Sequence, residues 1–458
     1  MFINTPKPQL KRDIGILLLL LIGIDGTIGG SIFVLLSGGI ELAGAYTPLA
    51  FMLGGILALF GGLLYAEVGT TIPRPGADLA YVFTAWKRRI VPFLFSWAVL
   101  LGDIGYLAIN ALGFGFYLGL VIGVPPVLIA LLALLAAAAI NLRGIKKAGK
   151  AEAITVSLLL LLFMAFAWYV NSGSVALTPL DYGDFQIGGI LAATALIFTS
   201  FVGYEYIATL SGEVKRPERS IPIALVITIV VSTIVFSGVA YVTLLGAPAE
   251  QLAASDAPLL VVANNIGGIG LGIVIPAALL ATGGSLIAAT MITSRRLYAI
   301  AHEGFLKRFL TKTNRHKVPT RAIVICSFIA ALLVITQAVN FVAYMSNTVY
   351  LGGLIMIAIS IMILRRKRPY LPRPFKAPLY PVIPIGIILL AGTLLFFVSV
   401  QSLLTVTMWL VLGWCFYLLG TVDKARWPLI LRGGLVFIIA LFGCLLLSAY
   451  FIVAALTR

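Results

Sequence analysis

The sequence predicts an all-α polytopic membrane protein, and three observations support this: its composition, the length of its apolar runs and the placement of its basic residues. Of the 458 residues, 61% are hydrophobic and 10% are charged, and the mean hydropathy is +1.10. A soluble chain of this length could not shield so much apolar surface from water. Apolar runs long enough to cross roughly 30 Å of hydrocarbon occur at thirteen places, namely 14–38, 45–68, 93–121, 125–142, 152–171, 187–211, 222–246, 270–297, 321–338, 341–364, 381–400, 404–420 and 432–455.

The basic residues fix the expected orientation of these spans. If the N-terminus is cytoplasmic, 31 of the 32 Lys and Arg residues fall on the inner side, and only Arg458 falls outside. The expected outer loops carry acids such as Glu41 and Asp181. This is the positive-inside pattern, so we expect a multi-pass protein of the cell membrane with a cytoplasmic N-terminus and an extracellular C-terminus. The net charge of +16 then needs no nucleic-acid partner.

Glycine-rich segments interrupt the first and the sixth spans. They read GIDGTIGGSIF at 23–33 and FTSFVGYEY at 198–206. Broken helices at corresponding positions of two halves are typical of inverted-repeat transporters. We therefore expect a 5+5 inverted-repeat transporter fold with broken helices 1 and 6, divided into a cytoplasmic N-terminal segment (1–13), two five-helix repeats (14–171 and 187–364) and three peripheral C-terminal helices (381–455).

Each interruption suggests a different chemistry. Around Gly29 and Gly30 an unwound helix would free N–H groups at the positive end of a half-helix dipole, which suits a carboxylate. The alternative is that these small residues only allow helices to pack closely. In the sixth span, Gly203 has aromatic neighbours and precedes Glu205, so free carbonyl groups there would suit an ammonium group beside an aromatic wall.

Five segments resemble signatures of the amino acid, polyamine and organocation (APC) superfamily of permeases. Together they run from the first span to the segment before the eleventh: TIGGSIF (27–33), YAEVGTTIPRPGADLAYVF (65–83), SGEVKRPERSIPIAL (211–225), SRRLYAIAHEGFLKRFLTKTNRHKVPTRAI (294–323) and KRPYLPRPFKAPLYPVIP (367–384). The segment at 211–225 is the most specific. Ser31 replaces the usual glycine of the first segment, and Lys307 replaces the usual proline of the fourth. The resemblance implies a permease for amino acids, and the span at 432–455 exceeds the usual twelve-helix plan.

The resemblance also implies a binding site at the two interruptions, with Gly203 in the second one. It implies that the substrate carboxylate is received by the N–H groups of Gly29, Gly30 and Ser31. The α-amino group would be received by the carbonyl groups of Gly26, Thr199 and Val202. Either Phe198 or Phe201 would then close over the substrate as a lid.

Four acidic residues lie within or at the ends of apolar spans, where ionisable groups are costly and are functional candidates. Asp25 is either a proton acceptor or counter-charge, or a structural acid held by hydroxyl groups such as that of Thr27. Glu205 has a structural or a coupling role. We expect Asp103 to pair across helices, and Glu67 to serve as a gate or capping residue.

Some relatives in the superfamily carry a coupling lysine in the fifth helix, whereas residues 153–170 hold no charge. Asp25 therefore becomes the main coupling candidate. We expect a secondary amino acid transporter that works by alternating access, with proton symport preferred over exchange. A polyamine or cationic amino acid carrier or exchanger is the alternative, and a membrane sensor or channel is the alternative of another class.

An enzyme is not expected. The three cysteines lie in apolar spans and both histidines lie in a basic loop, so neither a metal site nor a nucleophile is suggested. The expected partners are an amino acid, a proton as coupling ion and the lipid bilayer. No cofactor and no obligate protein partner are indicated.

Overall fold

The computed structural model describes residues 14–73, 77–143, 148–172, 177–315 and 318–421. These segments form helices joined by turns and short connections. Nine helical stretches of this described part are long and apolar enough to cross a membrane, and three shorter apolar helices accompany them. The expectation of an all-α polytopic fold is therefore confirmed, whereas the expected span at 432–455 lies outside the described residues.

Helices occur at twelve of the thirteen expected spans, and the first and the sixth are each divided in two. The divided spans are α1 (Ile16–Thr27) with α2 (Ser31–Ala43), and α8 (Ile187–Ile197) with the 3₁₀ segment η2 (Phe198–Phe201) and α9 (Glu205–Thr209). The other spans are α3 (Thr47–Thr71), α5 (Ile90–Ile122), α6 (Pro126–Arg143), α7 (Ala148–Asn171), α10 (Pro217–Gly246), α13 (Gly268–His302), α14 (Thr320–Thr336), α15 (Val339–Lys367), α16 (Val382–Leu395) and α17 (Val400–Thr421). Three short helices connect spans, namely α4 (Ala77–Ala85), α11 (Ala249–Ala253) and α12 (Pro258–Ile266).

Proline and glycine set several helix ends. Pro217 and Pro258 stand in the first turns of α10 and α12, where the fixed φ of proline suits a helix and its missing N–H group is not needed. Helix α5 ends at Gly123, which has φ +68° and donates its N–H group to the carbonyl of Gly119. Such left-handed glycine caps are common helix stops.

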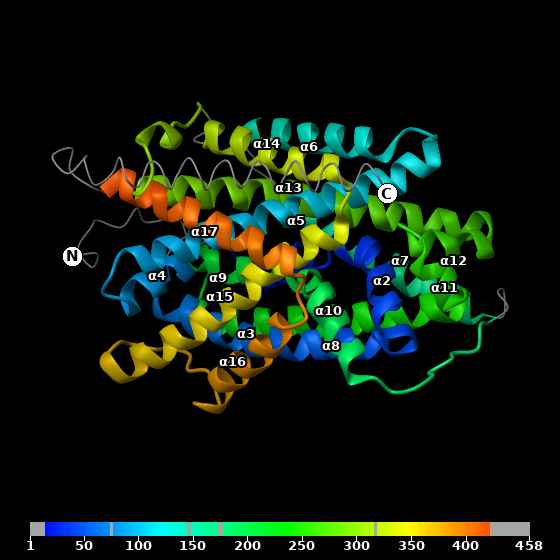
Figure 1. Ribbon diagram of the computed structural model, residues 1–458, viewed down its shortest axis with the longest axis horizontal. Coiled ribbons are helices and arrows are strands. Elements are labelled where there is room, and N and C mark those ends of the chain that lie inside the picture. The colour runs from blue at the N-terminus through cyan, green and yellow to red at the C-terminus, as the bar shows by residue number, and fades with distance from the viewer. Residues whose placement is uncertain (1–13, 74–76, 144–147, 173–176, 316–317, 422–458) are drawn as a thin grey trace.

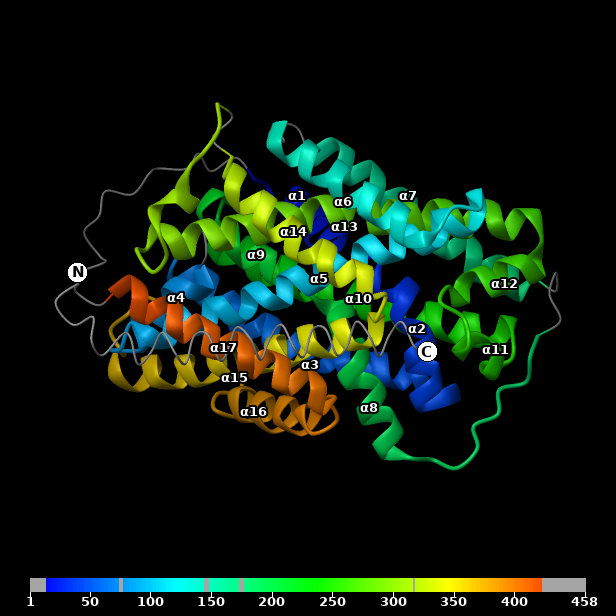
Figure 2. The ribbon, with the colours of Figure 1, turned by 45° about the horizontal axis from the view of Figure 1, so that its top comes forward.

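The broken helices lie inside a bundle of longer ones. Helix α5 packs against α13 and α15, and these helices cross the molecule along its long axis (Figure 1). Helix α1 is enclosed by α7, α9, α10 and α13 (Figure 2), while α2 packs mainly on α8. The interrupted backbone is thus shielded by protein, as non-helical backbone at membrane depth must be.

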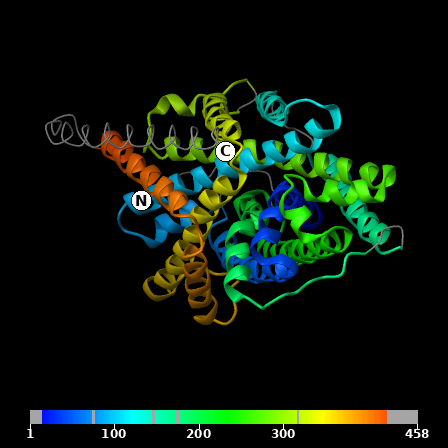
Figure 3. The ribbon, with the colours of Figure 1, turned by 45° about the vertical axis from the view of Figure 1, so that its right-hand side comes forward.

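The last two described helices lie at the outside of the bundle, as Figure 3 shows for α16 and α17 in orange. Helix α17 is attached to α5 by Trp97 and Trp409, whose rings stack at 4.6 Å and whose indole N–H groups each donate to the other residue's carbonyl. Large apolar side chains such as Trp168 and Phe396 are exposed. Exposed apolar side chains on the outside of a membrane bundle suit contact with lipid rather than with water.

Candidate functional site

The two helix interruptions touch each other. Gly203 has φ +121°, a backbone conformation that residues with a side chain rarely adopt. A Cβ added to Gly203 would collide with the carbonyl group of Gly26. Only glycine fits at this crossing. The sequence expectation that both spans are broken, and broken at glycines, is confirmed.

At the first interruption, the backbone between α1 and α2 turns within three residues. The N–H group of Gly29 donates to the carbonyl of Thr27 at 2.9 Å. The N–H group of Gly30 instead leaves its own helix and donates to Oδ1 of Asn110, on α5, at 2.8 Å. Ser31 then begins α2, and its buried hydroxyl has no hydrogen-bond partner in the described structure.

Polar side chains from α5 and α13 surround this interruption. The Tyr106 hydroxyl donates to the carbonyl of Gly26 at 3.0 Å, and the Ser285 hydroxyl donates to the carbonyl of Asp25 at 3.1 Å. The sequence analysis did not single out Tyr106, Asn110 or Ser285. An asparagine in the middle of an apolar span was the available signal, because polar side chains inside membrane helices usually hydrogen-bond to neighbouring helices.

Asp25 lies on the last turn of α1, is 7% exposed and faces α13. A Cβ added to Gly284 of α13 would lie 3.3 Å from its Oδ1. The Thr27 hydroxyl donates to the carbonyl of Gly23. The single proton of the Thr27 hydroxyl is thus directed to this carbonyl.

At the second interruption, the C-terminal end of α8 meets α15. Asn347 donates its amide N–H groups to the carbonyls of Ala195 and Leu196, at 2.9 and 2.6 Å. Its Oδ1 accepts a hydrogen bond from the Thr199 hydroxyl at 2.5 Å. The last carbonyl groups of a helix lack partners within it, so Asn347 acts as a cap supplied by another helix.

The carbonyl of Thr199 accepts the N–H group of Val202 at 3.1 Å, and Val202 has an extended backbone. The N–H group of Gly203 donates to Oε2 of Glu205 at 2.9 Å. Glu205 therefore holds the backbone just before the start of α9. This contact gives it a structural role and leaves its part in coupling as a prediction.

The two phenylalanines proposed as lids have different surroundings. Phe201 packs edge-on against Phe236 of α10, with ring centroids 5.2 Å apart. Phe198 lines a cavity of about 20 Å³ beside the second interruption, which is enough for about one water molecule. The placement thus favours Phe198 for contact with a ligand.

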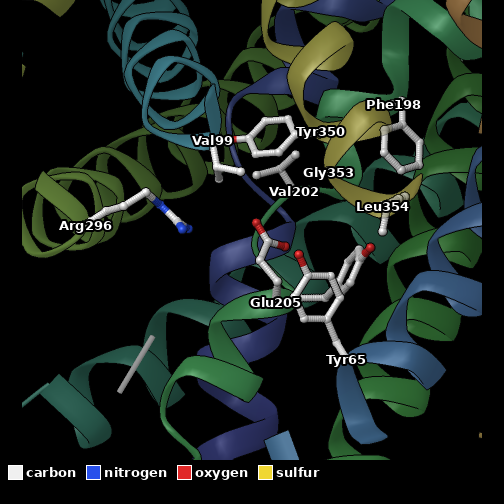
Figure 4. A pocket seen from close by; sticks show the side chains of 10 residues that line it. Tyr65, Val99, Phe198, Val202, Glu205, Arg296, Tyr350, Gly353 and Leu354 are labelled. Atoms are coloured by element: carbon white, nitrogen blue, oxygen red, sulfur yellow. The ribbon is translucent and has the colours of Figure 1, made fainter. Parts of the chain in front are cut away.

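The cavity has aromatic, apolar and charged walls. In Figure 4, Arg296 extends from α13 toward Glu205, which lies in the middle of the view. The rings of Tyr65, Tyr350 and Phe198 lie on the other side of Glu205. The lining comes from α3, α5, α8 to α9, α13 and α15, and consists of Tyr65, Val99, Phe198, Val202, Tyr204, Glu205, Arg296, Tyr350, Gly353 and Leu354.

Arg296 is the centre of a buried ion cluster. Its guanidinium group donates to Asp103 of α5 at 2.6 Å and to Asp78 of α4 at 2.9 Å. The Tyr350 hydroxyl adds a hydrogen bond to Asp103 at 3.1 Å. Pairing of Asp103 across helices is confirmed, but the sequence analysis missed Arg296 as its partner because the residue lies in a loop-flanking basic segment.

A second ion cluster forms around Glu67 at the end of α3. Arg365 of α15 pairs with its carboxylate at 2.5 Å, and Arg373 lies at 3.5 Å. The N–H group of Ala377 donates to the same carboxylate at 2.9 Å. Glu67 thus joins α3, α15 and the connection to α16, in agreement with its interpretation as a capping residue.

Searched over the described residues, the chain has no group of three or more His, Cys, Asp or Glu side chains able to hold a metal ion. Cys326 and Cys415 are free and buried. Cys444 lies outside the described part of the chain. The described contacts at the site are made by backbone groups, polar side chains and ion pairs.

Interrupted helices that meet at the centre of a membrane bundle define the class of protein as a polytopic permease. The family model described as amino acid permease matches residues 14–422, and the chain belongs to this family. The resemblance to the APC superfamily is confirmed, and the protein is a multi-pass membrane transporter rather than an enzyme.

Relatives named as permeases or transporters align over most of the chain. The branched-chain amino acid permease BcaP of Bacillus subtilis is 27% identical over 443 residues, which cover 91% of this chain and 94% of the relative. The Asc-type amino acid transporter 1 of Mus musculus is 26% identical over 401 residues, which cover 82% of this chain and 74% of the relative. The methylthioribose transporter of Bacillus subtilis is 24% identical, with coverage of 91% and 95%.

Proposed function

We propose that this permease carries neutral amino acids across the cell membrane as a secondary transporter, by alternating access and with proton symport. The observation that carries the proposal is the contact of two helix interruptions at Gly26 and Gly203. One interruption offers a helix N-terminus and the other a helix C-terminus. Together they suit the carboxylate and the ammonium group of one zwitterion.

In this proposal the N–H groups of Gly29, Gly30 and Ser31 bind the carboxylate. The carbonyl groups of Gly26, Thr199 and Val202 bind the ammonium group, beside Gly203. Phe198 closes over the substrate, since it lines the adjacent cavity, whereas Phe201 packs against Phe236. The lining of the cavity is largely aromatic and apolar, which matches an apolar substrate side chain in character. Two relatives are named as branched-chain amino acid permeases.

Alternating access is supported by where the ion clusters lie. Asp78 of α4 and Glu67 of α3 both bind arginines of other helices near one end of the bundle. Opening of a path at this end would break or rearrange these contacts. We propose that this end is cytoplasmic, as the basic loops predict. Reporter fusions after Lys215 and after Asp181 test the orientation, and an outward reporter after Lys215 would contradict it.

The primary test is counterflow in proteoliposomes with the purified protein. Vesicles loaded with unlabelled L-leucine should accumulate labelled L-leucine, and a panel of the standard amino acids and of putrescine and spermidine should rank the substrates by competition. A carrier saturates and shows counterflow, which a channel or a sensor does not. Absence of counterflow with every member of the panel would remove the proposed function.

Coupling is assigned to Asp25, the buried acid of the first interruption. Asn at this position keeps the volume and removes the titration. Asp25→Asn should therefore lower accumulation driven by a pH gradient, while exchange of labelled for unlabelled substrate survives. Uptake that keeps its wild-type dependence on the pH gradient would assign Asp25 a structural role and leave Glu205 as the remaining coupling candidate.

A cationic substrate is the second candidate, and the burial of Asp25 beside the site favours it. In that case Asp25→Asn would weaken competition by lysine, arginine and the polyamines and leave competition by neutral amino acids unchanged. The same panel therefore separates the two candidates. The two five-helix repeats at 14–171 and 187–364 remain our proposed division of the transport unit.

A further inference from the structure

Asn110 accepts a backbone N–H group that the proposed function assigns to the substrate carboxylate. Its side chain is fully buried on α5. The Nδ2 group donates to the carbonyl of Tyr106, one turn earlier, at 2.8 Å. This bond fixes the amide, so that Oδ1 faces α2 and accepts the N–H group of Gly30 at 2.8 Å.

The Gly30 N–H group is one of the donors at the start of α2 that the proposed function assigns to the carboxylate. Each backbone N–H group has one proton, so a carboxylate oxygen and Asn110 compete for it. An amide oxygen is a neutral acceptor, and a carboxylate forms the stronger charge-assisted bond. A carboxylate can therefore displace the amide, whereas an uncharged group gains little by doing so.

Two further observations place the carboxylate next to Asn110. The Ser31 hydroxyl is buried without a hydrogen-bond partner in the described structure. A Cβ added to Gly29 would lie 2.7 Å from the Ser285 hydroxyl and 3.1 Å from Oδ1 of Asn110. The Ser285 hydroxyl and the Asn110 oxygen thus both lie close to Gly29, just before the start of α2.

We propose that Asn110 is an internal substitute for the substrate carboxylate. It holds the Gly30 N–H group while no substrate is bound, and the substrate displaces it. The inference rests on the proposed function and narrows it, since substrates must carry a free carboxylate to compete with the amide. Asn110 is then a specificity-determining residue, because it closes the anion site to ligands that lack this charge.

Asn110→Ala removes the competitor and leaves the backbone donors unchanged. A hydrogen bond contributes about 0.5–1.5 kcal/mol net, so the affinity for L-leucine should rise about twofold to tenfold. L-leucinamide, which has no carboxylate, should bind weakly to both proteins. Binding is measured with the purified protein by competition against labelled L-leucine, together with its thermal stability.

Asn110→Asp keeps the shape of the side chain and adds a negative charge. At pH 8 it should lower the preference for L-leucine over L-leucinamide by at least about tenfold, because the added charge repels a carboxylate. The matched control is Asn141 of α6, which is also buried and also donates to the carbonyl one turn earlier, at 2.9 Å. Asn141→Ala and Asn141→Asp should leave the preference unchanged.

Failure of the inference is distinct from failure of the proposed function. If the wild-type protein binds no amino acid of the panel, the proposed function is wrong. If the wild type binds L-leucine but Asn110→Ala weakens or does not change this binding, Asn110 is a substrate ligand or a structural residue and the inference is overturned. Should Asn110→Ala fail to fold, Asn110→Leu, which keeps the volume and removes the acceptor, takes its place: a higher affinity for L-leucine supports the inference, and an unchanged or lower affinity overturns it.

Discussion

The centre of the molecule and the end that carries α4 are held together by different kinds of interaction. At the centre, the two helix interruptions are held by hydrogen bonds to neutral groups, such as the Asn110 amide and the Tyr106 hydroxyl, and to the Glu205 carboxyl group. At the α4 end, the contacts are ion pairs around Arg296 and Glu67. Neutral hydrogen bonds are weak enough for a substrate to replace, whereas buried ion pairs are costly to break.

Binding and closure therefore depend on different groups of the chain. The backbone donors and acceptors at the centre can exchange one partner for another without moving a charge. Opening the α4 end must separate charges or supply water to them. The variants below perturb the centre and the α4 end in turn, beginning with the largest expected effect.

Gly203→Ala should abolish transport, because the new Cβ would collide with the Gly26 carbonyl and the backbone has φ +121°. A loss of about a hundredfold or more in uptake corresponds to about 3 kcal/mol, the upper end of such backbone strain. The control is Gly238→Ala on α10, which meets no atom within 4 Å. Uptake is measured per folded protein, and near-normal uptake by Gly203→Ala would mean that the interruptions separate in the working transporter.

Arg296→Met should destabilise the protein by about 3–5 kcal/mol, because Asp78 and Asp103 would remain buried without their cation. The control is Arg295→Met, since Arg295 is the exposed neighbour on the same helix, and exposed substitutions usually change stability by less than about 0.5 kcal/mol. Thermal unfolding in detergent measures both.

A triple variant sharpens this test. Arg296→Met combined with Asp78→Asn and Asp103→Asn removes all three charges of the cluster, and neutral replacements of buried ion pairs are often tolerated. It should recover part of the lost stability. Equal destabilisation of the single and the triple variant would show that packing, rather than charge, makes Arg296 important.

Glu67→Gln should cost about 1–3 kcal/mol, less than loss of Arg296, because its partner Arg365 is partly exposed and can be solvated. Glu218→Gln, an exposed acid in the first turn of α10, is the matched control. Limited proteolysis of the α15 to α16 connection should become faster in Glu67→Gln only. A rate equal to wild type would argue against the role of Glu67 in fastening that connection.

The sequence was sufficient for the membrane spans and for the broken backbone. Long apolar runs and glycines at 26, 29, 30 and 203 are local features, and the helices of the twelve described spans begin and end within five residues of the expected positions. The partners across helices were not available in the same way. Asn110 reaches Gly30 across 80 residues and Arg296 reaches Asp103 across 193, so no periodicity or spacing links them.

The smallest effect is expected at Ser31, where the superfamily that the sequence resembles usually has glycine. The hydroxyl is buried and has no partner in the described structure, and an unmet buried polar group costs stability. Ser31→Ala should therefore leave the free energy of unfolding unchanged or raise it by up to about 1 kcal/mol. If the carboxylate is bound only by backbone N–H groups, the affinity for L-leucine should stay within about twofold of wild type. Binding weakened by about tenfold or more would instead assign the hydroxyl a direct hydrogen bond to the substrate and would place the neutral side chains, as well as the backbone, in the anion site.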